Sequence, residues 1–259
     1  MKVAIIGAGA FGTALGGVLA DNGIDVDYYD SKLEKERLSD VVADAKYVVL
    51  CVPSKVIPHL LPHLPKDKPL IVATKGILRC DAFDAFKDWM VLSGPGFAKD
   101  IKDRQLTTLT TTDKRVIDLF KNHYIDFDYT EDKCGVMMCG ALKNIYAILA
   151  GYLHLEYDSG EWHSYLGAAL NEIKAILKLN GARAETAELV CGIGDLKITC
   201  YYPSRNYEFG RLISDDPEYV PTNTVEGLSA LKRVINCEIK VPDDAELMHR
   251  LIEMGRQWA

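Results

Sequence analysis

The residues of this chain that could move a proton are lysines in apolar surroundings, and Lys143 is the clearest of them. It lies in the stretch 134–151, CGVMMCGALKNIYAILAG, whose apolar residues surround nearly the whole circumference of a helix and so predict a buried one. Lysine is seldom buried without a partner, and burial lowers its pKa toward neutrality. The alternative is a side chain that reaches from the helix edge to water. The first interpretation predicts a general acid or base.

Three further segments carry polar residues that suit such a lysine. Lys75 follows a strand-like run, at the edge where open α/β sheets bind ligands, although an exposed loop lysine would give the same pattern. Asp195 stands in a glycine-rich turn, where a plain turn residue would also fit. Arg205 beside Asn206 offers planar donors suited to a phosphate, and a solvated surface charge is the alternative.

The N-terminus carries the pattern of a dinucleotide site. Residues 2–6, KVAII, form a strand-like run, and residues 7–12, GAGAFG, follow it and open a helical pattern. In GxGxxG the first glycine permits a tight turn, the second lets the backbone approach a pyrophosphate, and the third allows close helix–strand packing. The helix N-terminus then faces the anion. Because a strand precedes the motif and another follows at 26–29, a dinucleotide site is favoured over a merely glycine-rich turn.

Asp30, at the end of that second strand, bears on the choice of cofactor. A carboxylate there accepts hydrogen bonds from a ribose 2′-hydroxyl and repels a 2′-phosphate, so NAD is favoured over NADP. The alternative is that Asp30 and Ser31 cap a helix over about 32–38, and the two roles are compatible.

Strands alternate with helical segments through the first half of the chain, and helices follow in the second half. This order predicts an α/β protein with an N-terminal Rossmann-type parallel-sheet domain, residues 1–130, followed by an all-helical substrate domain, residues 131–259. Further strands are expected at 47–52, 69–74, 89–93, 106–112 and 125–129.

Composition limits the classes of partner. The chain has 259 residues and a formal charge of −7, which argues against nucleic acid or an anionic membrane as the main partner. The seven cysteines are odd in number and include no CxxC pair, so we expect reduced thiols and a cytoplasmic protein. No apolar run approaches the ~18 residues that a membrane span would need, so no such span is expected. The few histidines form no ligand spacing with the cysteines, so no metal is expected.

Several short motifs occur together and in order, and GALKN and SRN are the most specific of them. They are GAGAFG at 7–12, TKG at 74–76, SGP at 93–95 with Phe97-Ala98, GALKN at 140–144, GIGDL at 192–196, SRN at 204–206 and VEG at 225–227. Over about residues 1–230 the chain resembles the NAD(P)-dependent sn-glycerol-3-phosphate dehydrogenase family. The resemblance implies an oxidoreductase that interconverts sn-glycerol 3-phosphate and dihydroxyacetone phosphate by hydride transfer with a nicotinamide cofactor.

The resemblance also implies roles for individual residues. Lys143 would be the acid/base group, Lys75 would contact substrate and stabilise the developing charge, and Asp195 would support the catalytic lysine. The implied substrate-binding residues are Lys75, Gly94, Gly96, Lys143, Asp195, Ser204, Arg205 and Asn206. The implied cofactor-binding residues are Gly7, Gly9, Ala10, Phe11, Gly12, Asp30, Ala98, Arg205 and Glu226. We expect a homodimer that acts on a small phosphorylated substrate.

The chain departs from the family pattern in places. Gly96 stands where the family usually has a serine that helps bind substrate, so one hydroxyl contact is missing. Ser31 falls where NADP-using relatives tend to have a basic residue, in agreement with Asp30. Because of Gly96, a dehydrogenase of another small phosphorylated or carboxylated hydroxy compound is one alternative. Because the chain is shorter than is usual in the family, a non-catalytic dinucleotide-binding sensor is another. Retention of Lys75, Lys143, Asp195, Arg205 and Asn206 argues against the sensor.

Overall fold

The chain divides into two compact units, which we describe separately. The structure is a computed structural model that describes residues 1–32, 37–77, 79–201 and 204–258. The first unit comprises Met1–Thr74 and Cys80–Lys133, and the second comprises Lys75–Arg79 and Cys134–Ala259. The short segment that begins at Lys75 therefore groups with the helical unit, whereas the sequence order had suggested the first domain.

A seven-stranded sheet with the order β2-β1-β3-β4-β5-β6-β7 forms the centre of the first unit. The strands are β1 (Lys2–Ile6), β2 (Asp25–Tyr29), β3 (Tyr47–Leu50), β4 (Leu70–Val72), β5 (Trp89–Ser93), β6 (Thr107–Thr111) and β7 (Ile125–Tyr129). Strands β1 to β5 pair in parallel, which confirms the predicted Rossmann-type sheet.

The edge formed by β6 and β7 runs the other way. Strand β6 pairs antiparallel with β5 and parallel with β7. The connection from β5 to β6 holds only the five-residue helix α4 (Ala98–Lys102), which turns the chain back instead of carrying it across the sheet as a full crossover helix would. The sequence pattern did not indicate this reversal.

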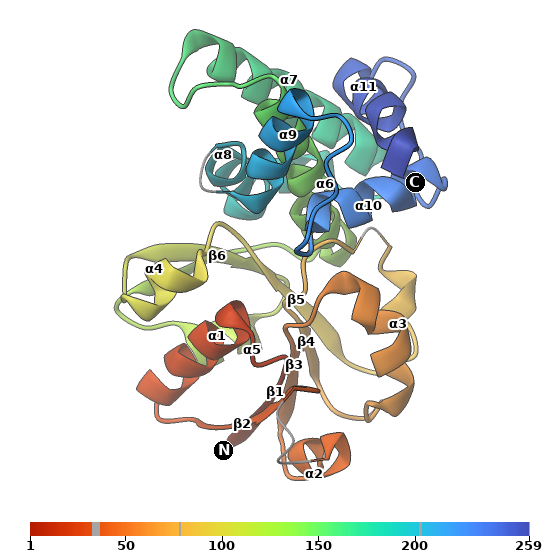
Figure 1. The fold of residues 1–259 in the computed structure, drawn as a ribbon. Helices are drawn as coiled ribbons and strands as arrows, with labels where there is room; N and C mark the ends of the chain where they lie inside the picture. The colour runs from red at the N-terminus through yellow and green to blue at the C-terminus, as the bar shows by residue number, and fades with distance from the viewer. Residues whose placement is uncertain (33–36, 78, 202–203, 259) are drawn as a thin grey trace. The chain divides into compact units, whose positions relative to one another are not determined.

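Helices cover the two faces of this sheet. Helices α1 (Ala10–Asp21), α4 and α5 (Lys114–Phe120) lie on one side, and α3 (Ile57–Leu60) lies on the other (Figure 1). Because side chains alternate along a strand, β1 sends Val3 and Ile5 into the core beneath α1, where they meet Leu15 and Leu19. The remaining helix of this unit, α2 (Leu38–Ala43), contacts β2.

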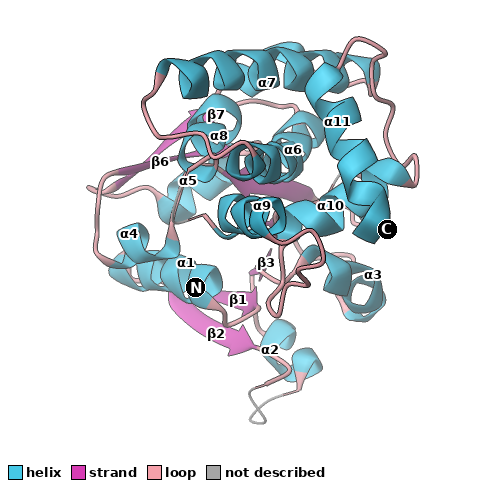
Figure 2. Ribbon diagram, turned by 45° about the horizontal axis from the view of Figure 1, so that its top comes forward, coloured by secondary structure: helices cyan, strands magenta, loops and turns pink. Residues whose placement is uncertain are grey.

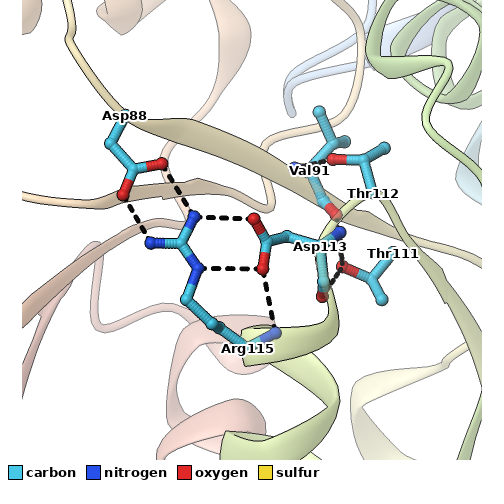
Figure 3. A network of polar contacts seen from close by, with 6 residues as sticks. All are labelled: Asp88, Val91, Thr111, Thr112, Asp113 and Arg115. Atoms are coloured by element: carbon cyan, nitrogen blue, oxygen red, sulfur yellow. Dashed lines mark hydrogen bonds and ion pairs between the residues drawn. The ribbon is translucent and has the colours of Figure 1, made fainter.

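Polar side chains tie β5, β6 and α5 together. Thr112 Oγ1 accepts a hydrogen bond from Val91 N at 2.9 Å, and Thr111 Oγ1 donates to Val91 O at 2.9 Å. Asp113 caps α5, and Arg115 forms paired hydrogen bonds with both Asp113 and Asp88 (Figure 3). The network fixes the start of α5 against the start of β5.

Helix α6 (Lys133–Tyr152) runs through the middle of the second unit, with other helices around it (Figure 2). These are α7 (Gly160–Leu179), α8 (Asp195–Thr199), α9 (Arg205–Asp215), α10 (Glu226–Ile235) and α11 (Glu246–Gly255). Among the described residues, α6 alone has the length and apolarity of a membrane span, so the expectation that no run has that length is wrong. Its apolar window is 94% buried inside the protein, as in a core helix.

Glycines allow α9 to lie very close to α6. A Cβ at Gly151 would lie 1.9 Å from Tyr207 O, and one at Gly210 would lie 1.9 Å from Ile148 O. Any larger residue at either position would push the helices apart. This contact brings the start of α9, with its Ser-Arg-Asn motif, onto the helix that carries Lys143.

Two other expectations meet the structure here. The helix expected over about 32–38 falls partly on residues 33–36, which lie outside the described ranges, and α2 begins only at Leu38. Five cysteines are free thiols, whereas Cys80 and Cys134 are disulfide-bonded. The expectation of reduced thiols is therefore wrong at these two positions.

Candidate active site

Lys143 is buried and makes two strong polar contacts, so it does not reach out to water. Only 5% of Lys143 is exposed to solvent, and its Nζ lies 2.8 Å from Asp195 Oδ1 and 2.8 Å from Thr199 Oγ1. Asp195 is fully buried at the start of α8. Thr199 stands one helical turn later, and its hydroxyl donates to the Asp195 carbonyl at 2.6 Å. The hydroxyl is thereby oriented to accept from the lysine.

Lys75 completes the cluster from the opposite side of the carboxylate. Its Nζ donates to Asp195 Oδ2 at 2.9 Å, so each carboxylate oxygen of Asp195 binds one ammonium group. The Lys75 side chain is 22% exposed and that of Lys143 only 7%. One carboxylate therefore joins two lysines of different accessibility, all within the second unit.

The environment adjusts the acidity of these groups. Burial, the largest cause, and the nearby Lys75 charge both lower the pKa of Lys143, while Asp195 opposes them, and the resulting pKa is about 8. Burial alone would raise the pKa of Asp195, but the two ammonium groups outweigh it and hold that pKa below its usual value. Lys143 is thus a cation near neutrality that gives up its proton far more readily than an exposed lysine.

Asn206 makes hydrogen bonds within the protein that its motif did not indicate. It is buried, its Nδ2 donates to Asn144 Oδ1 at 2.8 Å, and its Oδ1 accepts from Gly227 N at 2.9 Å. In turn Asn144 donates to Gly140 O within α6. The amide of Asn206 therefore joins α6, α9 and the start of α10. Its partner on α6, Asn144, is the residue directly after Lys143.

Arg205 is exposed at the first turn of α9, where it lines a groove of about 210 Å³. Phe209 and Leu212 give this groove an apolar wall, and the segment from Tyr219 to Val225 forms its other side. Ser204, the residue before the helix, is buried. Glu208 also lines the groove. Its Oε2 is buried, and no hydrogen-bond donor among the described residues contacts it.

The glycine loop of the first unit has the geometry that its sequence predicts. Gly7 has φ of +108°, and a Cβ on it would lie 2.6 Å from Cys51 O, while one on Gly12 would lie 2.0 Å from Gly7 O. Above Gly9, in contrast, there is open space. Tight packing on one side and free backbone on the other is the form of a site that a dinucleotide phosphate approaches.

Asp30 is tied directly to this loop. Its Oδ2 accepts a hydrogen bond from Ala8 N at 3.0 Å, and its Oδ1 accepts one from Lys32 N at 3.0 Å. The carboxylate therefore braces the loop and also closes a turn after β2. The remaining lone pairs of both oxygens leave it able to accept further hydrogen bonds.

The other expected residues lie in two groups. In the first unit, Gly94 has φ of +136° after β5, and Phe11 and Ala98 pack against the core beneath α1. A Cβ on Gly96 would lie 3.0 Å from Ile101 Cδ1 and 3.2 Å from Leu109 Cδ2, so the serine of the family pattern would need its neighbours to give way. Ala10 begins α1, and Glu226 begins α10 in the second unit.

Thr199 is a site residue that the sequence analysis missed. Its position four residues after Asp195 places both on one helix face, so spacing alone could have suggested it. Within the described part of the chain, no three His, Cys, Asp or Glu side chains gather to hold a metal ion.

Comparison with known proteins decides the family. Residues 30–116 match the family model for the N-terminus of NAD-dependent glycerol-3-phosphate dehydrogenase, and residues 132–254 match that for its C-terminus. The chain belongs to this family. The N-terminal match begins at Asp30, so the support for the glycine loop at 7–12 comes from its geometry and not from that match.

Curated relatives and solved structures agree with this assignment. Glycerol-3-phosphate dehydrogenase [NAD(P)+] of Bacillus velezensis is 31% identical over 82% of this chain and 76% of its own, and that of Bacillus cytotoxicus is 33% identical over 82% and 77%. The crystal structure of glycerol-3-phosphate dehydrogenase from Coxiella burnetii has a TM-score of 0.79 at 22% identity, covering 99% of this chain and 98% of that one. At that identity the likeness supports the fold.

Proposed function

We propose that this protein interconverts sn-glycerol 3-phosphate and dihydroxyacetone phosphate, with Lys143 as the acid/base group. The observation that carries the proposal is the buried cluster in which Asp195 bridges Lys143 and Lys75, in a chain of the glycerol-3-phosphate dehydrogenase family. The names of the relatives supply the substrate pair, and the cluster supplies the proton chemistry.

Proton transfer follows from the placement of Lys143. In the reducing direction the Lys143 ammonium gives its proton to the alkoxide oxygen that forms from the carbonyl, and the resulting amine regains a proton afterwards. A pKa of about 8 suits this role, because the group is charged near neutrality yet its proton is easily transferred. Asp195 and Thr199 hold Nζ in one orientation. In the oxidising direction the neutral amine accepts the proton instead.

Lys75 has the complementary task. It is more exposed than Lys143 and remains beside Asp195, so its ammonium stabilises negative charge on the same substrate oxygen. Two cations near a developing alkoxide, with one carboxylate behind them, favour the transition state over the neutral carbonyl.

The first unit fits a nicotinamide dinucleotide. The loop from Gly7 to Gly12, open above Gly9 and at the N-terminus of a 12-residue helix, is suited to a pyrophosphate. When bound, the nicotinamide supplies or accepts the hydride. The resemblance to the family assigns Ala10, Phe11, Asp30, Ala98, Arg205 and Glu226 to the binding of the cofactor.

NAD is the preferred cofactor in this proposal. Asp30 ends β2 and is fixed by the Ala8 amide, so its charge stays near the loop and opposes a 2′-phosphate. Ser31 beside it offers no positive charge to compensate.

Arg205 is assigned to the phosphate of the substrate. It is exposed at the start of α9, and its guanidinium can bind a phosphate through two hydrogen bonds. Ser204 would contribute beside it, while Asn206 would act by holding α9 and α10 onto α6. Gly94 and Gly96 would contact substrate through backbone groups, without the serine hydroxyl of the family pattern.

One assay tests this function. Purified protein with NADH should oxidise the cofactor when dihydroxyacetone phosphate is added, and NADPH should be the poorer cofactor. A panel of other small phosphorylated or carboxylated carbonyl compounds serves as the comparison. Faster turnover of another compound would replace the substrate assignment, and no turnover of any would contradict the enzyme. The homodimer remains a prediction that light scattering during size exclusion measures.

A further inference from the structure

Arg233 connects the end of α10 to the loop that carries Lys75. Its side chain is 29% exposed, and its Nη1 donates to Gly76 O at 3.1 Å, across 157 positions of sequence. Both residues belong to the second unit. The carbonyl it holds is that of the residue directly after Lys75.

The guanidinium is held in place by an acidic partner. Arg233 Nε lies 2.8 Å and Nη2 2.7 Å from Glu238 Oε2. Glu238 N also donates to Arg233 O at 3.1 Å, after a turn in which Cys237 has φ of +60°. Because Glu238 binds two of its nitrogens, the guanidinium is oriented before it meets Gly76, and the bond to the carbonyl costs little side-chain entropy.

The segment that contains Lys75 needs such support. Residues 75–79 group with the helical unit, although the residues on either side of them belong to the first unit. Gly76 has φ of +89°, a conformation that favours glycine and sets the direction of its carbonyl. The bonds from Arg233 to Gly76 and from Lys75 to Asp195 both join this segment to the helices.

We propose that Arg233, oriented by Glu238, is a positioning residue that fixes Lys75 against Asp195 by holding the Gly76 carbonyl. The proposal rests on the function given above for its catalytic meaning. The alternative is a partly exposed ion pair without influence on the site, since such pairs contribute little on their own.

The effect of this positioning is measurable at Lys143. The charged and titratable groups that act on Lys143 are Asp195, Lys75 and Cys200, and the Lys75 charge is one that lowers its pKa. If Lys75 is less firmly held, this lowering weakens and the pKa of Lys143 rises. Loss of Arg233 and loss of Glu238 should therefore both raise the pKa of Lys143. A direct charge effect would instead give opposite directions, because one removes a positive charge and the other a negative one.

The experiment compares Arg233→Met with Glu238→Ala by NMR titration of lysines carrying ¹³C at the ε position, with the Lys143 signal assigned from Lys143→Met. Lys232→Met, which removes a charge from the same turn of α10, is the matched control. This readout requires neither substrate nor turnover, so it stays informative if the proposed function fails. Thermal unfolding shows whether each variant is folded.

We expect the pKa of Lys143 to rise in both variants by roughly half a unit to one unit, and to stay unchanged in Lys232→Met. Arg233→Lys, which keeps a donor for Gly76, should restore part of the wild-type value. Movement in opposite directions, or no movement in either variant, would overturn the proposal. With dihydroxyacetone phosphate as substrate, the alkaline limb of kcat/KM should move by the same amount, while the affinity for NADH stays unchanged.

Discussion

Lys143 and Asp195, 52 residues apart in sequence, meet as a buried ion pair with Nζ and Oδ1 2.8 Å apart. A buried ion pair of this kind destabilises the fold unless its remaining hydrogen-bond donors and acceptors have partners. Here Thr199 accepts a hydrogen bond from Lys143, and Lys75 donates one to the second carboxylate oxygen of Asp195. The arrangement keeps a lysine charged in the core while leaving it ready to exchange its proton.

Asp195→Asn should shift the pH dependence of reduction to lower pH. Asp195 raises the pKa of Lys143 against the effect of burial, so its neutralisation lowers that pKa below about 8. Reduction needs protonated Lys143 and is lost as pH rises through its pKa, so the alkaline limb of kcat should move toward neutrality. Thr199→Val, which removes a hydrogen bond without a charge, should move it less. If the alkaline limb of kcat does not move in Asp195→Asn, Asp195 does not influence proton transfer by Lys143.

Asn206 and Arg205, although neighbours, should respond differently to alanine. Asn206→Ala leaves buried groups on Asn144 and Gly227 unpaired and should lower the free energy of unfolding by about 1–3 kcal/mol for each. Arg205→Ala should leave the melting temperature unchanged and raise KM for dihydroxyacetone phosphate by roughly tenfold or more, since hydrogen bonds to charged groups contribute about 1.5–3 kcal/mol.

Arg211→Ala, on the same helix, is the control for the loss of one positive charge. If Arg205→Ala keeps the wild-type KM, the phosphate is held elsewhere and the assignment of Arg205 is wrong.

Asp30→Asn separates the two roles of this carboxylate. Asparagine can still accept from Ala8 N and so keep the glycine loop braced, but it lacks the charge that opposes a 2′-phosphate. The ratio of kcat/KM for NADPH to that for NADH should rise by roughly tenfold, ~1.4 kcal/mol. Adding Ser31→Arg should extend the shift through a charge-assisted bond.

Asp30→Ala, which loses the bond to the loop as well, should weaken the binding of both cofactors. An unchanged cofactor preference in Asp30→Asn would mean that Asp30 only braces the loop.

Arg115→Gln should destabilise the first unit in a pH-dependent way. Hydrogen bonds from Arg115 hold the pKa values of Asp88 and Asp113 below the ordinary 3.8. Groups with a lowered pKa stabilise the fold above the unfolded value and lose that contribution as pH falls through the folded one. The pairs are about one-third exposed, so the loss near neutrality should be only about 1 kcal/mol.

Urea unfolding of wild type and Arg115→Gln at neutral pH and below pH 3.8 measures this difference. The two proteins should converge in acid. A constant difference at both pH values would mean that packing and not charge accounts for the effect.

The sequence carried much of this structure because several of its signals are local. Short apolar, strand-like runs predicted the strands, and the glycine spacing predicted both the tight turn at Gly7 and the open backbone at Gly9. The buried character of Lys143 followed from the apolar residues around it. Thr199 could have been found by the same reasoning, from its helical spacing to Asp195.

Other features depend on contacts that no local pattern encodes. The bond from Arg233 to Gly76 joins residues 157 positions apart, and nothing in either segment indicates the other. The motif of Asn206 also did not indicate its hydrogen bonds to Asn144 and Gly227, which the close approach of α9 to α6 makes possible. The reversal of β6 likewise depends on how α4 packs after β5.

The most direct test of the account is Lys143→Met. Methionine keeps the length and helix propensity of lysine while removing the proton donor. The variant should fold, bind NADH as tightly as the wild type, and lose kcat for dihydroxyacetone phosphate by ~10²–10⁴-fold, the usual contribution of a positioned acid/base group. A folded variant that binds NADH and turns over at a near-normal rate would show that Lys143 is not the proton donor.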